Sequence, residues 1–192
     1  MKKGVLLVIV LSFVFAFGSL VLAEEDVPSL LESASSSYEA GDLAQTIQLL
    51  EEALDLVRER SPLVVDNFYL VTEPAQLYGN FQIRENNIFS PTDKMRFYAE
   101  PKNYNYNEVP DGYETWIKVD FVVMDTEGKV QGEQENFLNQ KFFSRSKIHD
   151  FFLNLSINLG GALSAGDYIV EFTVKDGISN KQAVVRQDFV VE

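Results

Sequence analysis

The stretch that decides the fold reads Gly166-Asp167-Tyr168-Ile169-Val170-Glu171-Phe172-Thr173-Val174-Lys175-Asp176. Successive side chains of a β-strand point to opposite faces, so apolar residues at every second position mark a strand with one buried face. One face of this stretch carries only apolar side chains, namely Tyr168, Val170, Phe172 and Val174. Glu171 and Thr173 belong to the other face. The pattern therefore predicts a strand that packs against a second layer of structure.

Similar runs fill the rest of residues 62–192. We expect strands over Val64–Thr72, Asn80–Arg84, Lys94–Glu100, Thr115–Asp125, Gly128–Lys141, Asp150–Asn158 and Ala183–Val191. Turn residues separate these runs, for example Asp125 to Gly128, which predicts a hairpin turn. No helical pattern interrupts them. Seven or eight short strands without intervening helices predict an antiparallel β-sandwich.

Residues 29–60 show a different periodicity, which predicts two helices separated by Gly41-Asp42. We expect Asp42 to cap the second helix, because its carboxylate can accept from amides of the first turn. Three- and four-residue spacing places five apolar residues on one face of that helix. They are Leu43, Ile47, Leu50, Leu54 and Val57. Pro62 ends the helix.

This predicted hairpin resembles one tetratricopeptide repeat (TPR). The resemblance lies in Ala34, in the run from Tyr38 to Leu43, and in Ala53-Leu54. Thr46 departs from the family, which usually has Ala there, and the proline expected soon after Leu54 is missing. Because stacked repeats need about three units, a single hairpin must bury its apolar face on a neighbouring domain or on another chain.

The segment from Leu163 to Asp176 resembles the late strands of bacterial immunoglobulin-like and fibronectin type III-like modules. A second segment, from Gly79 to Asp93 and on to Glu100, resembles uncharacterised exported bacterial proteins that carry such sandwiches. The first resemblance implies an immunoglobulin-like (Ig-like) fold, and the second implies a location. The predicted fold class is therefore α+β, with an N-terminal helical hairpin and an Ig-like antiparallel β-sandwich of seven or eight strands.

The first 23 residues predict export. Lys2 and Lys3 precede an uncharged apolar run from Gly4 to Leu22, and Ala23 stands before an acidic residue. This is the layout of a signal peptide cleaved after Ala23. An uncleaved anchor is the alternative, because the run approaches the roughly 20 residues that span a bilayer. We therefore expect a periplasmic or extracellular protein divided into residues 1–23, a hairpin at 24–61 and a sandwich at 62–192.

The composition excludes several classes of function. The chain has a formal net charge of −13, and cleavage after Ala23 makes it −15 because only two lysines are lost. Such a charge repels phosphate backbones, so we expect no nucleic acid partner. The chain has no cysteine, which excludes disulfides, thiolate metal sites and Cys nucleophiles.

Residues for catalysis are scarce. His149 is the only histidine, and the nearby serines, Ser144, Ser146 and Ser156, stand in no nucleophile motif. With one histidine and no cysteine, a metal site of nitrogen and sulfur ligands is nearly excluded. The Asp and Asn residues of the turns fit no dedicated calcium loop. We expect no catalytic residue, no metal and no cofactor.

The best binding candidates are aromatic residues of the segment 101–114, which we expect to form a long loop, and of the strand that follows it. They are Tyr104, Tyr106, Tyr113 and Trp116. Loop tyrosines offer contact area and a hydroxyl at low entropic cost. The alternative interpretation is that these rings cover one end of the sandwich and that Trp116 is a core residue of its strand.

Two functions follow from these observations. The favoured one is a non-catalytic interaction or scaffold protein of the cell envelope that binds a protein partner there. It would meet the membrane only through residues 1–23, and only if they are not cleaved. The alternative is a carbohydrate- or peptide-binding module that uses the Tyr104–Trp116 aromatic loop.

Overall fold

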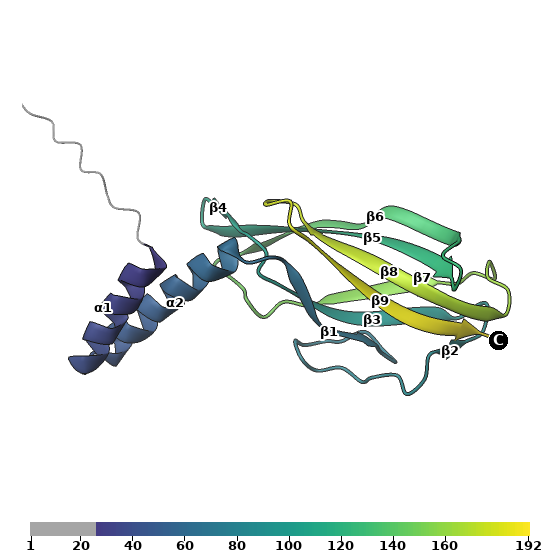
Figure 1. Cartoon of the computed structure of the whole chain (residues 1–192), viewed down its shortest axis with the longest axis horizontal. Coiled ribbons are helices and arrows are strands. Elements are labelled where there is room, and N and C mark those ends of the chain that lie inside the picture. The colour runs from purple at the N-terminus through teal and green to yellow at the C-terminus, as the bar shows by residue number, and fades with distance from the viewer. Residues whose placement is uncertain (1–25) are drawn as a thin grey trace, which may run out of the picture.

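The computed structural model describes residues 26–192, so the predicted signal peptide or anchor at residues 1–23 lies outside the described residues. Over residues 26–192 the chain forms a pair of helices and then nine strands (Figure 1). The helices are α1 (Val27–Glu39) and α2 (Leu43–Arg60). The strands are β1 (Val64–Leu70), β2 (Ile88–Phe89), β3 (Lys94–Lys102), β4 (Asn107–Val109), β5 (Gly112–Asp125), β6 (Val130–Ser144), β7 (Leu153–Asn158), β8 (Gly166–Asp176) and β9 (Gln182–Val191).

The strands form two sheets. The smaller sheet has the strand order β1-β3-β7, and the larger has the order β2-β9-β8-β5. In the larger sheet, β6 pairs along most of β5, and the short β4 pairs with the first residues of β5. In an Ig-like sandwich, a sheet with the order of β1-β3-β7 packs against a sheet with the order of β9-β8-β5-β6, and this chain has that arrangement. The predicted fold class is therefore confirmed.

Three local details differ from the prediction. The segment Asn80–Arg84 forms no strand and makes only isolated bridges, Val71 with Ile83 and Leu77 with Asn80. Two very short strands, β2 and β4, were not predicted, and β2 pairs with β9 in parallel. Segment 71–87 runs as an irregular chain because its polar and turn residues interrupt any two-residue alternation.

The core lies between the sheets and is rich in phenylalanine. Tyr168, Val170, Phe172 and Val174 of β8 are all buried, which confirms the alternation predicted for this strand. Phe172 lies at the centre, with its ring 5.0 Å from that of Phe97 on the opposite sheet, at an interplanar angle of 72°. Edge-to-face contacts of this kind stabilise a core beyond the area that they bury.

A buried polar network ties the outer side of the small sheet together. The carboxylate of Glu100 on β3 accepts from Tyr98 Oη at 2.6 Å, from Tyr78 Oη at 2.9 Å and from Asn67 Nδ2 at 2.9 Å. Burial alone would raise the pKa of Glu100, but these hydrogen bonds and the charge of Lys102 hold it below its ordinary value. Burial and the bond to Glu100 raise the pKa of Tyr98 to about 12.

This network predicts a pH-dependent contribution to stability. Because the pKa of Glu100 is lower in the folded chain, its stabilisation is present above the ordinary Glu pKa and is lost as the pH falls through the folded value. We expect Glu100→Gln to lower the free energy of unfolding at pH 7 by about 1–3 kcal/mol. In urea unfolding, the difference from the wild type should shrink at pH 3. The exposed Glu133→Gln is the control, and a deficit that is equal at both pH values would contradict the argument.

The hairpin forms as its caps predict. Asp42 Oδ1 accepts from the backbone N–H of Gln45 at 3.0 Å, which confirms it as the N-cap of α2, and Asp26 caps α1 in the same way. Between the helices lie the small side chains of Ala34 and Ala53, both buried. Among residues 26–192, no helix combines the length and apolar character needed to cross a membrane.

Candidate functional site

The hairpin projects from one end of the sandwich, opposite the end that holds the C-terminus (Figure 1). A cleft of about 360 Å³ lies where the last turns of α2 meet the sandwich. Its walls come from α2, β1, the β3–β4 connection and the segment that precedes β7. The side chains that line it include Asp55, Lys102, Tyr104, Tyr106, Lys147 and His149.

A charged cluster joins the helix to the sandwich across this cleft. The carboxylate of Asp55 lies 2.8 Å from Lys147 Nζ, 3.1 Å from His149 Nε2 and 3.5 Å from an Arg58 guanidinium nitrogen. Burial and the nearby charge of Arg58 lower the pKa of His149, and the attraction of Asp55 offsets this only to a limited extent. The described ion pair that joins the helix to the sandwich at Asp55 is therefore chiefly the one with Lys147.

The prediction of a long loop at residues 101–114 is wrong, because most of these residues belong to strands β3, β4 and β5. Only residues 103–106 connect β3 to β4. Tyr104 and Tyr106 both donate their hydroxyls to the carbonyl oxygen of Ile148. Burial raises the pKa of both phenols. These two tyrosines therefore hold the segment before β7 against the sandwich.

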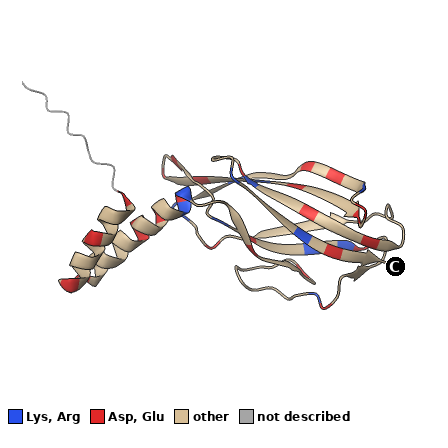
Figure 2. Cartoon of the chain, viewed as in Figure 1, with Lys and Arg blue, Asp and Glu red and all other residues tan. Residues whose placement is uncertain are grey.

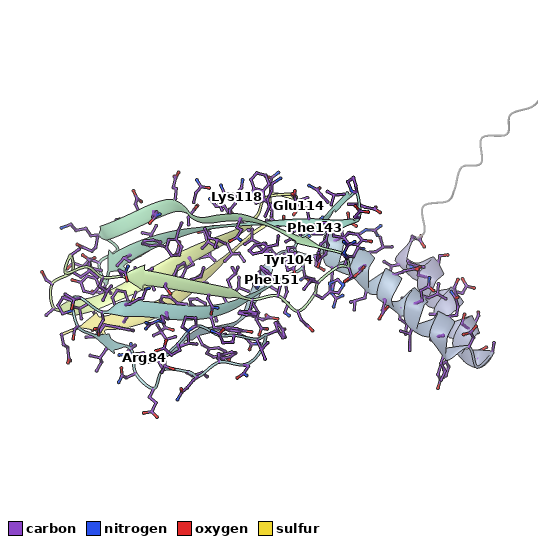
Figure 3. All side chains as sticks on the ribbon, turned by 180° about the vertical axis from the view of Figure 1, so that it is seen from behind. Arg84, Tyr104, Glu114, Lys118, Phe143 and Phe151 are labelled. Carbon is purple, nitrogen blue, oxygen red and sulfur yellow. The ribbon has the colours of Figure 1, made fainter. Side chains whose placement is uncertain are left out.

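Three of the four aromatic candidates come together and the fourth does not. The ring of Tyr106 lies 5.4 Å from that of Tyr104 and 6.1 Å from that of Tyr113. Figure 3, which labels Tyr104 beside Phe151, places this group at the sandwich end that adjoins the hairpin. Trp116 stands three residues after Tyr113 on β5, so strand alternation turns it to the opposite face.

Trp116 lies on the outer face of the large sheet, half-buried, and it is not the core residue that the alternative interpretation expected. The ammonium groups of Lys118 and Lys141 lie 3.9 Å and 5.1 Å from the centre of its ring, in cation–π contacts. Its Nε1 donates to Asn139 Oδ1 at 2.7 Å. Gly177 packs so closely against the indole that a Cβ would lie 2.5 Å from it. These contacts fix the ring against its own sheet.

The chemistry near His149 remains limited in the described residues. Ser144 donates its hydroxyl to the carbonyl oxygen of Ser146, and His149 Nε2 is directed at Asp55. Over residues 26–192 no group of three or more His, Asp or Glu side chains is arranged to hold a metal ion. The arrangement holds the helix and the sandwich together.

Lys181 completes the junction, and no pattern in the sequence predicted its role. Its ammonium group donates to the carbonyl oxygens of Glu59 at 2.6 Å, Arg58 at 3.3 Å and Asn103 at 3.0 Å, and to Asn105 Oδ1 at 2.7 Å. A lysine from the β8–β9 turn thus caps the last carbonyls of α2, where a cation suits the helix dipole. Burial lowers its pKa, although Asp176 and Glu59 act in the opposite direction.

We expect Lys181→Met to loosen this junction without unfolding the sandwich. The uncapped carbonyls should let the last turn of α2 open more often, and residues 57–63 should exchange their amide hydrogens roughly 5- to 30-fold faster. Hydrogen exchange followed by mass spectrometry measures this. The exposed Lys129→Met is the control, and unchanged exchange at residues 57–63 would show that Lys181 does not hold the helix.

The second feature of this end is an apolar stripe along α2. We use this name for Leu43, Ile47, Leu50, Leu54 and Val57. Their three- and four-residue spacing predicted one shared face, which we expected a neighbouring domain or another chain to cover. Instead, each side chain of the apolar stripe is between 44% and 58% exposed. The contact with α1 is made by other residues of α2, chiefly Thr46 and Ala53.

No protein-family model matches the sequence, and no curated protein matches it. Among solved structures, the C-terminal domain of wzt is similar at 12% identity over 69% of this chain and 74% of that one, with a TM-score of 0.42. An immunoglobulin-like protein from Pseudomonas aeruginosa is similar at 10% identity over 69% and 98%, with a TM-score of 0.38. The sporulation control protein Spo0M from Bacillus subtilis is similar at 7% identity over 69% and 50%, with a TM-score of 0.39. At such identities no residue role passes to this chain.

Proposed function

We propose that this chain is a non-catalytic interaction or scaffold protein of the cell envelope, and that its TPR-like hairpin is the docking element. The observation that carries the proposal is the apolar stripe, which lies exposed on a helix that projects from the sandwich. Contiguous exposed apolar side chains are unusual on a soluble surface and mark interaction sites.

The junction supports the same proposal. The hairpin meets the sandwich through the last turns of α2, where Asp55 binds Lys147 and Lys181 caps the helix. These contacts hold the helix at its end and leave its sides free. We expected either the neighbouring domain or another chain to bury the apolar stripe. The sandwich leaves the apolar stripe exposed, which favours burial by another chain.

The environment of the partner follows from the N-terminal sequence. We propose that residues 1–23 direct the chain out of the cytoplasm, so the partner belongs to the envelope or the extracellular space. The strongly negative charge disfavours nucleic acid as the partner.

The proposal predicts that charge on the apolar stripe abolishes docking. We expect Ile47→Glu with Leu54→Glu to reduce capture of the partner from a solubilised envelope fraction at least tenfold, because both carboxylates would have to be desolvated. The exposed Gln45→Glu, on the same helix but outside the apolar stripe, is the matched control. Circular dichroism should show all three proteins folded, and equal capture by the double variant would refute the docking role.

A second candidate function is binding of a carbohydrate or an extended peptide, and the cleft favours it. Its volume of about 360 Å³ falls within the usual range for small-ligand sites, and Tyr104 and Tyr106 line it. Under this candidate, Tyr106→Ala should lose retention on a glycan or peptide array, whereas the apolar stripe variants should keep it. Trp116 lies on another face, so the same ligand could not reach it.

A further inference from the structure

We infer that the apolar stripe binds a second copy of itself, so that two α2 helices pair antiparallel between two chains. The inference rests on the proposed function, because it names the occupant of the same docking surface. The spacing of the apolar stripe, the charges at the two ends of the hairpin and the position of the sandwich support it.

The spacing of the apolar stripe is that of a helix-pairing seam. Its residues follow one another at alternating steps of four and three, from Leu43 to Val57. This is the heptad spacing by which one helix packs along another, and not the wider face that a helix presents to a sheet. The partner that fits this surface is therefore another amphipathic helix.

The spacing also allows the seam to match itself when reversed. If a two-fold axis passes at Leu50, then Leu50 faces its own copy, Leu43 lies level with Val57, and Ile47 lies within one residue of level with Leu54. Each apolar residue then meets an apolar residue of the partner chain. Such an interface is isologous and closes after two subunits, as most homodimers do.

The charges at the two ends of the hairpin favour the antiparallel direction. The tip carries Glu39 and Asp42 and no basic residue in the last turn of α1, whereas the last turn of α2 carries Arg58 and Arg60 with Glu59 between them. Figure 2 shows this separation, with acidic residues along the outer portion of the hairpin and basic residues beside the sandwich. Antiparallel pairing sets the acidic tip of one copy against the basic end of the other. Parallel pairing would set like charges together.

The position of the sandwich also favours antiparallel pairing of the helices. Each sandwich is attached at the C-terminal end of its α2, where Lys181 holds it (Figure 1). In a parallel pair, both sandwiches would lie at the same end of the paired helices. They would compete for the same space there, because the helix pair is narrower than a sandwich. An antiparallel pair places them at opposite ends. The two hairpins then form a four-helix bundle, in which Leu31 and Tyr38 of α1, now exposed, lie beside the seam.

Sedimentation velocity of the purified residues 24–192 over a concentration series tests the pairing. We expect a reversible dimer that Leu50→Glu weakens at least about 30-fold, because the two introduced carboxylates face each other at the axis. Gln45→Glu should leave the dimer intact. A wild type that is monomeric at every concentration overturns the inference. The docking function survives that result if the monomer still captures an envelope partner that Ile47→Glu with Leu54→Glu loses.

Disulfide formation tests the direction, and the chain suits it because its sequence contains no cysteine. Two cysteines can bridge only when their Cα atoms lie within about 7 Å. Leu50→Cys should therefore form a covalent dimer with itself under mild oxidation. Leu43→Cys alone should not, whereas a mixture of Leu43→Cys and Val57→Cys should form the mixed dimer. Self-coupling of Leu43→Cys would show a parallel pair and overturn the antiparallel assignment.

Discussion

Replacement of Phe172 by alanine is expected to lower the free energy of unfolding by about 3–5 kcal/mol. Phe172 is fully buried, and its ring contacts those of Phe97, Phe68 and Phe121 at centroid distances between 5.0 and 6.2 Å. These neighbours belong to both sheets, and each is held by its own strand. They therefore cannot move in to fill the cavity that the substitution would leave. A loss of this size is a large fraction of the stability of an ordinary domain, which is about 5–15 kcal/mol.

Urea unfolding followed by tryptophan fluorescence measures the effect, because Trp116 is the only tryptophan and lies on the neighbouring strand β5. Thr173→Ala, on the next residue and the opposite face of β8, is the matched control and should cost much less. If the two variants lost equal stability, the alternating burial of β8 and the sandwich core built on it would be contradicted.

The second large effect is expected at Asp176, whose carboxylate is 1% exposed. It accepts from the backbone N–H of Asn105 at 2.8 Å and of Ile178 at 2.9 Å, and from the hydroxyl of Ser179. Asp176→Ala would leave these donors buried without an acceptor. We expect a loss of about 2–4 kcal/mol in the free energy of unfolding.

The same substitution should act on the hairpin, because Asp176 joins the β8–β9 turn, which carries Lys181, to the β3–β4 connection, which Lys181 contacts. Amide exchange at the end of α2 should rise together with the loss of stability. Asp167→Ala, an exposed aspartate at the start of β8, is the control. A variant at position 176 that matched this control in stability would show that the buried carboxylate is not structural.

Strand periodicity was sufficient to predict most of the fold. The run around Phe172 alternates without interruption, so its buried face could be predicted from parity alone. The predicted N-cap at Asp42 was also confirmed, since a capping carboxylate depends only on its own first turn. Segment 71–87 was harder to predict because its packing depends on the distant Tyr98 and Asn154. The backbone N–H of Gly79 donates to Tyr98 Oη, and the side-chain amide of Asn154 makes two hydrogen bonds with the backbone of Ala75.

The candidate site was only partly predictable. The tyrosines were recognised as a cluster, but treating residues 101–114 as a loop concealed that Tyr113 and Trp116 lie on one strand and therefore on opposite faces. A parity count on the strand would have separated them. The cluster around Asp55 could not be found from spacing, because Lys147 and His149 lie more than 90 residues further along the chain.

The exposure of the hairpin also lay beyond the sequence. Three- and four-residue spacing shows that Leu43 and Leu50 share a face, but it does not show what covers that face. The answer depends on the angle at which α2 leaves the sandwich, and Lys181 and Asp55 fix that angle through contacts distant in sequence. The proposed docking function depends on this one geometrical fact.

A photo-reactive amino acid at position 50, incorporated in the full chain in its native envelope, tests that fact most directly. Position 50 is the centre of the apolar stripe, and a photo-reactive side chain couples to whatever lies against it. The account predicts covalent adducts to another polypeptide, with the same group at the exposed, off-stripe position 45 giving few. Coupling confined to the chain's own sandwich would show that the hairpin folds back to cover the apolar stripe, and it would contradict the account.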